Sequence, residues 1–458
     1  MRLYKYLLPL SLICLLVANS VIAAPGGQDD NSYEQELNDR DFDALRDFLK
    51  ARRTEDVLQK KSNLIVSGDC HFEWRHLNET CCGNRERGHK RFDAKGRPIS
   101  RNDFDVEANL YFNCLYEKSW AVVQVRYDNS AGVDDNDHPC IGLLDPDATG
   151  SNCGSSCLKR SIGCNGDPEG YHGSGVCDKV CLKKAYFGYN FLENDCARVD
   201  IELGRRGNLY SVLESNVQFL SRFDGVYLKY DQAFEEVADW YLHSLAFVID
   251  ERVNHFGWAV ETGLIGIADT NFEVKYSFID WIKNGRNRCH VDNPVGFNFL
   301  NSQVILAYNL DPAYLGKGVR FYAAYLYNHA ADDLIVYRKH GPYNAGRQNM
   351  AWYAGVFIGK VRKEGDWAVE LQYQYVEAQA MPDQDSAGIG RGNVLDESLT
   401  TCSRRGNTNF KGWKIEALYA FTDNITLDSI FEASVALDPK IGGAHTYNKF
   451  ECEAVYAF

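Results

Sequence analysis

The chain has 458 residues, and its 63 acidic side chains exceed its 49 basic ones to give a formal net charge of -14. Nucleic acids and anionic lipid surfaces attract basic proteins, so this charge argues against either as a partner. The composition is rich in aromatic residues, with 27 Tyr and 24 Phe against only 11 Pro, which favours β-strands and the aromatic girdles of membrane barrels.

Residues 1–23 have the pattern of a secretory signal peptide. Two basic residues precede an apolar run from Leu7 to Val17, and small residues follow around Ala24. Beyond this segment no stretch reaches the roughly eighteen apolar residues of a spanning helix, which leaves an exported soluble protein or a β-barrel. Cys14 leaves with the peptide, so an even number of cysteines remains, and export then favours disulfides over catalytic thiols.

Residues 24–61 are predicted to be a periplasmic segment with a helix from about Tyr33 to Lys61. Apolar residues recur there at spacings of three, four and more, among many charged residues. From Leu64 onward the hydrophobic period changes to two, which is the period of β-strands. Residues 62–458 are therefore predicted to form one β-domain.

The clearest predicted strand runs from Trp367 to Tyr375, where apolar and polar residues alternate so that one face suits lipid and the other water. The same alternation recurs along the chain and predicts sixteen strands. They lie at residues 64–76, 104–116, 119–128, 184–192, 196–204, 222–230, 236–249, 255–268, 271–282, 299–310, 318–328, 349–360, 366–378, 411–422, 425–437 and 448–458.

The joins between these strands alternate in length. Short joins such as 117–118 separate long ones, which include 77–103, the Cys-rich 129–183, 205–221 and 379–410. Outer-membrane barrels have short periplasmic turns and long extracellular loops, whereas compact soluble domains seldom carry many long loops. The sequence therefore predicts an all-β membrane fold, a 16-stranded antiparallel transmembrane β-barrel.

The closing strand alternates up to Phe458, a pattern that resembles the signal outer-membrane proteins present to their assembly machinery. In a closed barrel this strand pairs with the first one. If Leu64 lies opposite Phe458, then Cys70 lies opposite Cys452. A disulfide across this seam and two lipid-facing thiols are the alternatives.

Five segments carry a resemblance to a known family. They are Ser67–Asp69, Ser221–Tyr227, Phe247–His255, Tyr276–Trp281 and Gly412–Tyr419. In these segments the chain resembles the outer-membrane porin family of amoeba-associated (Parachlamydia-like) chlamydiae, in the putative porin superfamily. The resemblance implies a trimeric channel for passive diffusion, in a bacterial outer membrane that is cross-linked by disulfides.

The inward row of the barrel wall is expected to line the pore. Acids outnumber bases in this row, and rings of carboxylates favour cations, so a weak cation preference is expected. The alternative is that many of these charges pair across strands and merely solvate the wall. The wall residues expected to line the pore are Arg126, Glu202, Arg320, Glu370 and Asp428.

The third extracellular loop of general porins folds into the lumen, and by order it follows the fifth predicted strand here. The resemblance thus places Arg205, Arg206 and Glu214 at a constriction. The two arginines would face acids such as Glu370 or Asp428 and create a field across the lumen. A simple surface loop is the alternative.

Nine cysteines are candidates for disulfides, namely Cys81, Cys82, Cys140, Cys153, Cys157, Cys164, Cys177, Cys181 and Cys196. Seven of them fall between residues 140 and 196, so at least one must pair outside this cluster, stay free or cross-link to another molecule. The adjacent Cys81 and Cys82 are natural partners. Zinc is the alternative ligand, but its sites usually show tighter Cys-x2-Cys or Cys/His spacing.

The sequence contains no arrangement of Ser, His and acidic residues, and no phosphate-binding glycine pattern, that indicates an enzyme or a cofactor. The predicted function is a porin of the bacterial outer membrane for ions and small hydrophilic solutes. The lipid bilayer, two further copies of the chain in a homotrimer, and disulfide-linked envelope proteins are the expected partners. The alternative is a structural surface protein or adhesin that a barrel anchors.

Overall fold

The computed structural model describes residues 63–81, 84–87, 102–131, 179–194, 196–234, 237–250, 255–283, 298–310, 317–338, 341–382, 385–389, 393–394, 405–406 and 408–458. The chain divides into two units, residues 1–37 and 38–458, and every described residue belongs to the second. The signal peptide and the helical segment predicted for residues 1–61 lie outside the described residues. In the described part, no helix is both long and apolar enough to cross a membrane.

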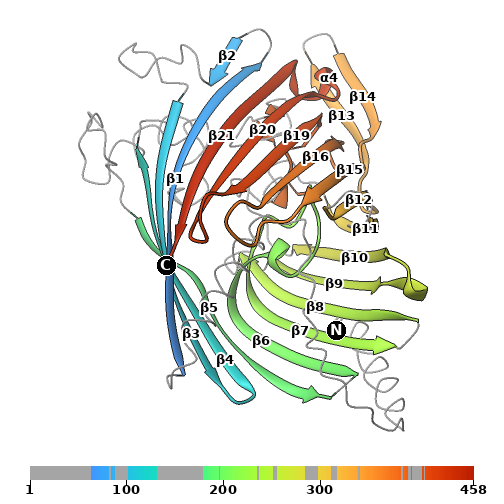
Figure 1. Ribbon diagram of the computed structural model, residues 1–458. Helices are drawn as coiled ribbons and strands as arrows, with labels where there is room; N and C mark the ends of the chain where they lie inside the picture. Colours follow the sequence, from blue (N-terminus) through green and yellow to red (C-terminus); the bar gives the residue numbers. More distant parts are fainter. Residues whose placement is uncertain are drawn as a thin grey trace. The chain divides into compact units, whose positions relative to one another are not determined.

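Sixteen antiparallel strands form a closed ring (Figure 1). In ring order they are β1 (Leu64–Cys81), β3 (Asn102–Tyr116), β4 (Ser119–Ala131), β5 (Lys179–Glu193), β6 (Ala197–Asn208), β7 (Arg222–Phe234), β8 (Ala238–Asp250), β9 (His255–Ile265), β10 (Phe272–Lys283), β11 (Leu300–Leu310), β12 (Val319–Asn328), β15 (Met350–Gly359), β16 (Trp367–Val376), β19 (Phe410–Ala420), β20 (Ile425–Ala436) and β21 (His445–Ala457). All sixteen predicted strands are confirmed, and long alternating segments are why the prediction succeeded.

Smaller elements extend some of the joins between ring strands. A short strand, β2 (Asn84–Arg87), pairs with the end of β1, and β13 (Asp333–Arg338) forms a hairpin with β14 (Gly341–Arg347). Two-residue strands, β17 (Asn393–Val394) and β18 (Arg405–Gly406), pair with each other. The described helical turns are η1 (Leu209–Ser211), η3 (Ile267–Asp269) and α4 (Pro439–Gly442).

The ring closes where β1 pairs with β21 on one side and with β3 on the other. The amide of Gly68 donates to the carbonyl of Phe458 at 3.0 Å, and the amide of Phe458 donates back at 2.9 Å. Because no edge remains in the ring, its backbone donors and acceptors are satisfied without water, as crossing a bilayer requires.

The seam register corrects one expectation from the sequence. Phe458 lies opposite Gly68 instead of Leu64, because the stagger of strands in a closed barrel displaces the pairing by four residues. Cys70 consequently faces Tyr456, and Cys452 faces Trp74. Both cysteines are free, so the seam disulfide is wrong.

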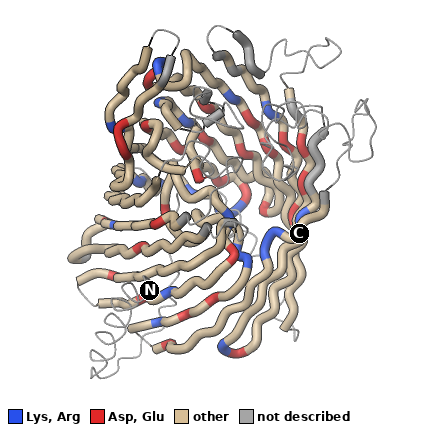
Figure 2. The backbone as a smooth tube through the Cα atoms, turned by 180° about the vertical axis from the view of Figure 1, so that it is seen from behind, with Lys and Arg blue, Asp and Glu red and all other residues tan. Residues whose placement is uncertain are grey.

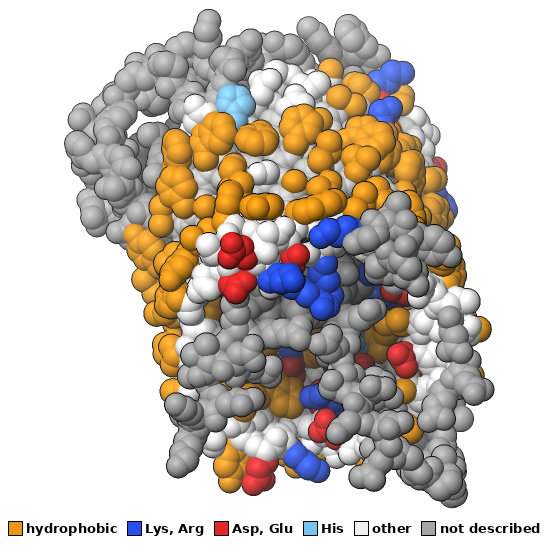
Figure 3. Space-filling model, viewed as in Figure 1, with side chains coloured by type: hydrophobic (Ala, Val, Ile, Leu, Met, Phe, Trp, Pro, Cys, Tyr) orange, Lys and Arg blue, Asp and Glu red, His pale blue; other side chains and the backbone are white. Residues whose placement is uncertain are grey.

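The two faces of the ring differ in chemistry. On β16 the outward Trp367 and Leu371 are 39% and 40% exposed, whereas the inward Glu370 and Gln372 are almost fully buried. Figure 3 shows apolar side chains gathered in a broad band over the outer surface. This pattern of apolar residues outside and polar residues inside is the reverse of a soluble protein and is typical of membrane barrels.

Several large inward rings lie over glycines of the neighbouring strand. Trp120 faces Gly188, and a Cβ atom at that glycine would come within 2.2 Å of the indole. Tyr322 lies over Gly355 in the same way, with its hydroxyl 2.4 Å from the position of such a Cβ. The glycines therefore let these rings rest against the wall, which leaves room inside the ring.

Candidate pore and constriction

The segment between β6 and β7, residues 209–221, folds against the inner wall of the barrel. Its apolar side chains Leu209, Val217 and Phe219 are at most 1% exposed. Leu209 and Phe219 belong to a cluster with Leu245 of β8 and Ile279 of β10. Burial of each such side chain stabilises the folded segment by roughly 1.5–3 kcal/mol. The expectation that this loop folds into the barrel agrees with its position.

Glu214 fixes this segment to the wall at three points. Its carboxylate accepts from Lys275 Nζ of β10 at 2.7 Å, and its amide donates to Glu261 of β9 at 2.9 Å. Its carbonyl accepts from Gln303 Nε2 of β11 at 2.7 Å. Glu214 is the only charged residue of the segment, and Lys275 is 2% exposed. Glu214 therefore faces the wall, and its charge is paired there.

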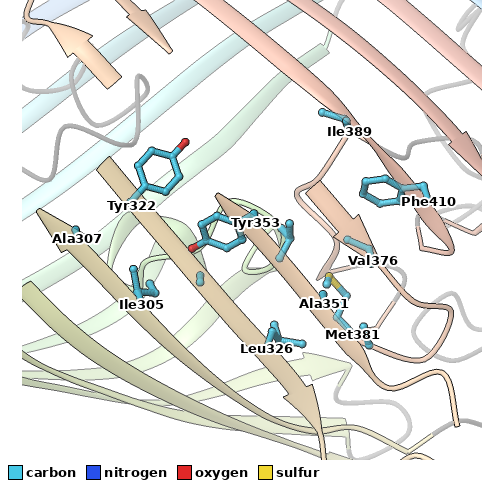
Figure 4. Packing of buried hydrophobic residues seen from close by; sticks show 13 residues of the cluster. Ile305, Ala307, Tyr322, Leu326, Ala351, Tyr353, Val376, Met381, Ile389 and Phe410 are labelled. Carbon is cyan, nitrogen blue, oxygen red and sulfur yellow. The ribbon is translucent and has the colours of Figure 1, made fainter. Parts of the chain in front are cut away.

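A second segment, residues 377–382 and 385–389, also lies inside the barrel. After β16 ends, Ala380, Met381 and Ile389 are at most 2% exposed. They share a cluster with Val217 of the first segment and Tyr353 of β15, part of which Figure 4 shows. The sequence prediction treated these residues as an ordinary long loop. The apolar residues that continue past the end of β16 were the available signal.

Hydrogen bonds join the two segments to each other. Gln374 of β16 donates to the carbonyl of Asn216 at 3.0 Å and accepts from the amide of Ile389, also at 3.0 Å. The amide of Ala387 donates to the carbonyl of Val217 at 2.9 Å. We call residues 209–221 the first and residues 377–382 with 385–389 the second of the two inner segments. The part of the ring they contact, β8 to β12 with β15 and β16, is called the covered wall.

The strands on the other side of the ring, β20, β21, β1, β3 and β4, are called the seam wall. In a ring of sixteen strands β1 is eight positions from β10, so the seam wall faces the covered wall across the lumen. Figure 2 shows acidic and basic positions distributed along these strands. The lumen is thus bounded by uncharged or internally paired segments on one side and by charged strands on the other.

Ion pairs and hydrogen bonds cover much of the seam wall. His71 of β1 bonds to Asp69 through one ring nitrogen and to Glu453 of β21 through the other. Lys449 Nζ lies 3.3 Å from Glu432 and 3.0 Å from Glu451. The side chain of Lys449 keeps 14% exposure, compared with 2% for Lys275 under the inner segments. Lys449, Glu432 and Glu451 therefore keep partial contact with the lumen solvent, whereas Asp69 and Asp428 are almost fully buried.

The predicted lining residues on the wall are all placed on inward positions. Arg126 pairs with Glu107 of β3, and Glu202 pairs with Arg206. The guanidinium of Arg320 donates to Glu273 at 2.6 Å. Glu370 and Asp428 are each 2% exposed. Glu370 accepts a hydrogen bond from the Tyr322 hydroxyl. Pairing across strands, the alternative stated from sequence, accounts for most of these contacts.

Arg205 and Arg206 are placed differently from the expectation, because β6 continues to Asn208 and both belong to the strand. Arg205 shares the outward phase with Ile201 and pairs with Asp224 of β7 at 2.6 Å. Arg206 points inward, pairs with Glu202, and lies 5.1 Å from the centre of the Tyr186 ring. A bulge between Arg205 and Gly207 separates the two arginines. Neither one faces Glu370 or Asp428.

The cysteine predictions fall mostly outside the described residues. Cys82, Cys140, Cys153, Cys157, Cys164 and Cys177 are not described, and neither is the side chain of Cys81. Cys181 and Cys196 are free thiols within this chain, and a cross-link from either to another molecule stays a prediction. Cys114 of β3 is free and exposed as well. Among the described residues, no group of three or more His, Cys, Asp or Glu residues could hold a metal ion.

Comparison with known proteins identifies one matching family and many similar barrels. Residues 295–438 match the family described as "Putative porin". These residues include β11, β12, β15 and β16 of the covered wall, together with β19 and β20. The match covers less than a third of the chain. No curated protein matches the chain.

Similar solved structures are distant in sequence. A high-pH structure of Pseudomonas putida OprB is 8% identical, with a TM-score of 0.48 over 86% of this chain and 94% of that one. Salmonella typhi OmpF in complex with daunomycin is 11% identical, with a TM-score of 0.44 and coverages of 86% and 98%. A triple mutant of the Rhodopseudomonas blastica porin is 9% identical, with a TM-score of 0.39 and coverages of 86% and 100%. Such scores indicate neither substrate nor mechanism.

Proposed function

We propose that the protein is a channel-forming outer-membrane porin through which ions and small hydrophilic solutes diffuse. The observation that carries this proposal is the seam wall, a charged and partly solvated surface inside a closed ring whose outer face is apolar. The match of residues 295–438 to the porin family supports it. A barrel that served only as an anchor would need no solvated inner surface.

The inner segments set which part of the lumen conducts. They pack against the covered wall, and Glu214, the charged residue of the first one, is paired with Lys275, so solutes pass along the seam wall. Charged groups there remain near water and interact with passing ions. Carboxylates exceed permanent cations among them, since β1 and β21 carry Glu73, Glu451 and Glu453 beside Arg75 and Lys449. This excess favours cations weakly.

The finer parts of the proposal rest on the sequence. The bacterial outer membrane, the homotrimer and the lineage of amoeba-associated chlamydiae are what the five resembling segments imply. Disulfide links to other envelope proteins would need cysteines outside the described residues or exposed thiols such as Cys70 and Cys114. Non-reducing electrophoresis of isolated envelopes tests these links.

Conductance across a planar bilayer tests the function. We expect long-lived open channels with a cation preference, and passage of small sugars in liposome swelling with sugars of graded size. A folded, inserted barrel that carries no current and passes no sugar would contradict the porin and support the anchored surface protein. If the channel is a homotrimer, the current should change in groups of three equal steps.

A further inference from the structure

Asp385 occupies an unusual place between the inner segments. Its side chain is fully buried, yet it belongs to a loop segment and has no basic partner among the groups that act on it most strongly. One carboxylate oxygen accepts from the amide of Ser221 at 2.9 Å, and the other accepts from the amide of Phe219 at 3.2 Å. Its carbonyl also accepts from the amide of Leu220 at 3.1 Å. Asp385 thus holds three successive amides of the other segment.

The turn that Asp385 holds is strained. Phe219 has a φ of 81°, a left-handed backbone conformation that bulky residues rarely adopt. Its carbonyl accepts from the amide of Tyr210 at 2.9 Å, which closes the segment on itself. Such a conformation persists only where surrounding contacts determine it. Here those contacts come from Asp385 and from the apolar packing of the Phe219 ring.

We propose that Asp385 is a positioning residue that latches the two inner segments together, and that this latch weakens as the pH rises. The proposal rests on the porin function, because its consequence is a change in the channel. When the latch opens, residues 209–221 and 385–389 can leave the covered wall and interrupt the current along the seam wall.

The latch weakens with rising pH because Asp385 is buried without a compensating positive charge among the groups that act on it most strongly. Burial raises the pKa of Asp385 from its ordinary 3.8 to about 7, and hydrogen bonds from Ser221, Phe219 and Gln218 oppose this rise only in part. The other titratable groups of the inner segments are Tyr210, Glu214, which is paired with Lys275, and Glu377, which accepts from the amide of Met350. Asp383 lies outside the described residues.

The sign is that of a carboxyl group whose pKa is raised in the latched state. The latched state binds the proton more tightly than the released state, so protonation favours the latch. The latch has its full stability below pH 3.8, the ordinary pKa of Asp385. It loses stability as the pH rises toward about 7, the pKa of Asp385 in the latched state. Between about pH 5 and about pH 8.5, pKa values of 3.8 and about 7 imply a fall in the ratio of latched to released states of about a hundredfold.

The test compares full-length wild type with Asp385→Asn, which cannot ionise. Asp366→Asn is the matched control, because Asp366 also accepts from two backbone amides, those of Arg362 and Lys363, but lies in the exposed turn before β16. Single-channel recordings in a planar bilayer should show current interruptions that increase with pH in the wild type and in Asp366→Asn. Asp385→Asn should show no such increase.

Hydrogen exchange at Phe219 and Ser221 in the wild type gives a second measurement that requires neither a variant nor a conducting channel. After correction for intrinsic exchange, protection should fall as the pH rises. Constant protection, or unchanged pH dependence of the current in Asp385→Asn, overturns the latch. Absence of current in the wild type at every pH would instead overturn the porin function, and the exchange experiment would still decide the latch.

Discussion

The covered wall and the seam wall both carry polar groups inside the barrel, but they differ in how water reaches these groups. On the covered wall, Lys275 and Glu214 form an ion pair beneath a packed segment, and each is nearly inaccessible to water. On the seam wall, Lys449 bonds to two carboxylates and keeps contact with the lumen. The difference shows that pairing of charge does not by itself make a conducting surface, because solvent access must be preserved as well.

The largest expected effect comes from breaking the covered ion pair. Lys275→Met leaves Glu214 without its buried cation, whereas Glu273 keeps Arg320, and the loss should destabilise the folded state by about 3–5 kcal/mol. Urea unfolding in phospholipid vesicles measures this loss. Lys449→Met is the matched change on the seam wall and should cost about 1 kcal/mol or less, since water solvates its former partners. Equal losses in the two variants would remove the distinction between the walls.

A smaller loss of stability is expected when apolar contacts of the second inner segment are removed. Met381→Ala removes a side chain that is 1% exposed and packs in the cluster of Figure 4, so a loss of about 2–5 kcal/mol is expected, nearer the lower limit if the segment relaxes. Met350→Ala, at a half-buried position at the start of β15, is the control and should cost less. More frequent current interruptions in Met381→Ala would link packing to the channel. An unaltered stability would show that the segment does not dock.

Ion selectivity provides a finer comparison. Glu451→Gln removes one charge from the seam wall, and at about 10 Å in water such a charge changes an ion's energy by about 0.4 kcal/mol, or about twofold in its local concentration. The ratio of cation to anion permeability, from reversal potentials in a salt gradient, should fall by up to about fourfold, because the local anion concentration changes in the opposite direction. Glu261→Gln lies under the inner segments and should leave the ratio nearly unchanged. The reverse ranking would place the conducting path along the covered wall.

The smallest effect is expected at Arg205. Its pair with Asp224 is well exposed on the outward phase, so Arg205→Ala should cost at most about 1 kcal/mol of stability and leave selectivity unchanged. Arg206→Ala should shift selectivity further toward cations, because Arg206 faces inward beside Glu202 and two tyrosine rings. Reversal potentials of the two single variants separate these outcomes. A matching shift in both would mean that Arg205 also contacts the lumen.

The strands could be predicted from sequence because their signal is local. Alternation in a segment such as Trp367–Tyr375 identifies both the strand and its faces, and the inward positions of Glu202, Glu370 and Asp428 follow from the same phase. The alternation of short and long joins then gave the ring. Each of these inferences depends on residues a few positions apart.

The constriction could be predicted only in outline. Register across the seam depends on the stagger of the whole ring. The predicted register, which placed Cys70 opposite Cys452, was therefore wrong by four residues. The bulge at Arg206 shifts the phase of the residues that follow it, and no composition signal marks it. Asp385 meets Phe219 from a position 166 residues away in sequence, a contact that only the folded chain reveals.

The mutual hydrogen bonds of Gly68 and Phe458 join positions 390 apart in the chain, whereas the other ring pairings join consecutive ring strands. Closing so long a loop carries the greatest entropic cost of any pairing in the ring. Until this contact forms, β1 and β21 each present a row of unpaired backbone groups to any strand that approaches. The seam is therefore where an unfinished molecule is most vulnerable to pairing with the wrong chain, and where a helper that shields one open edge would act.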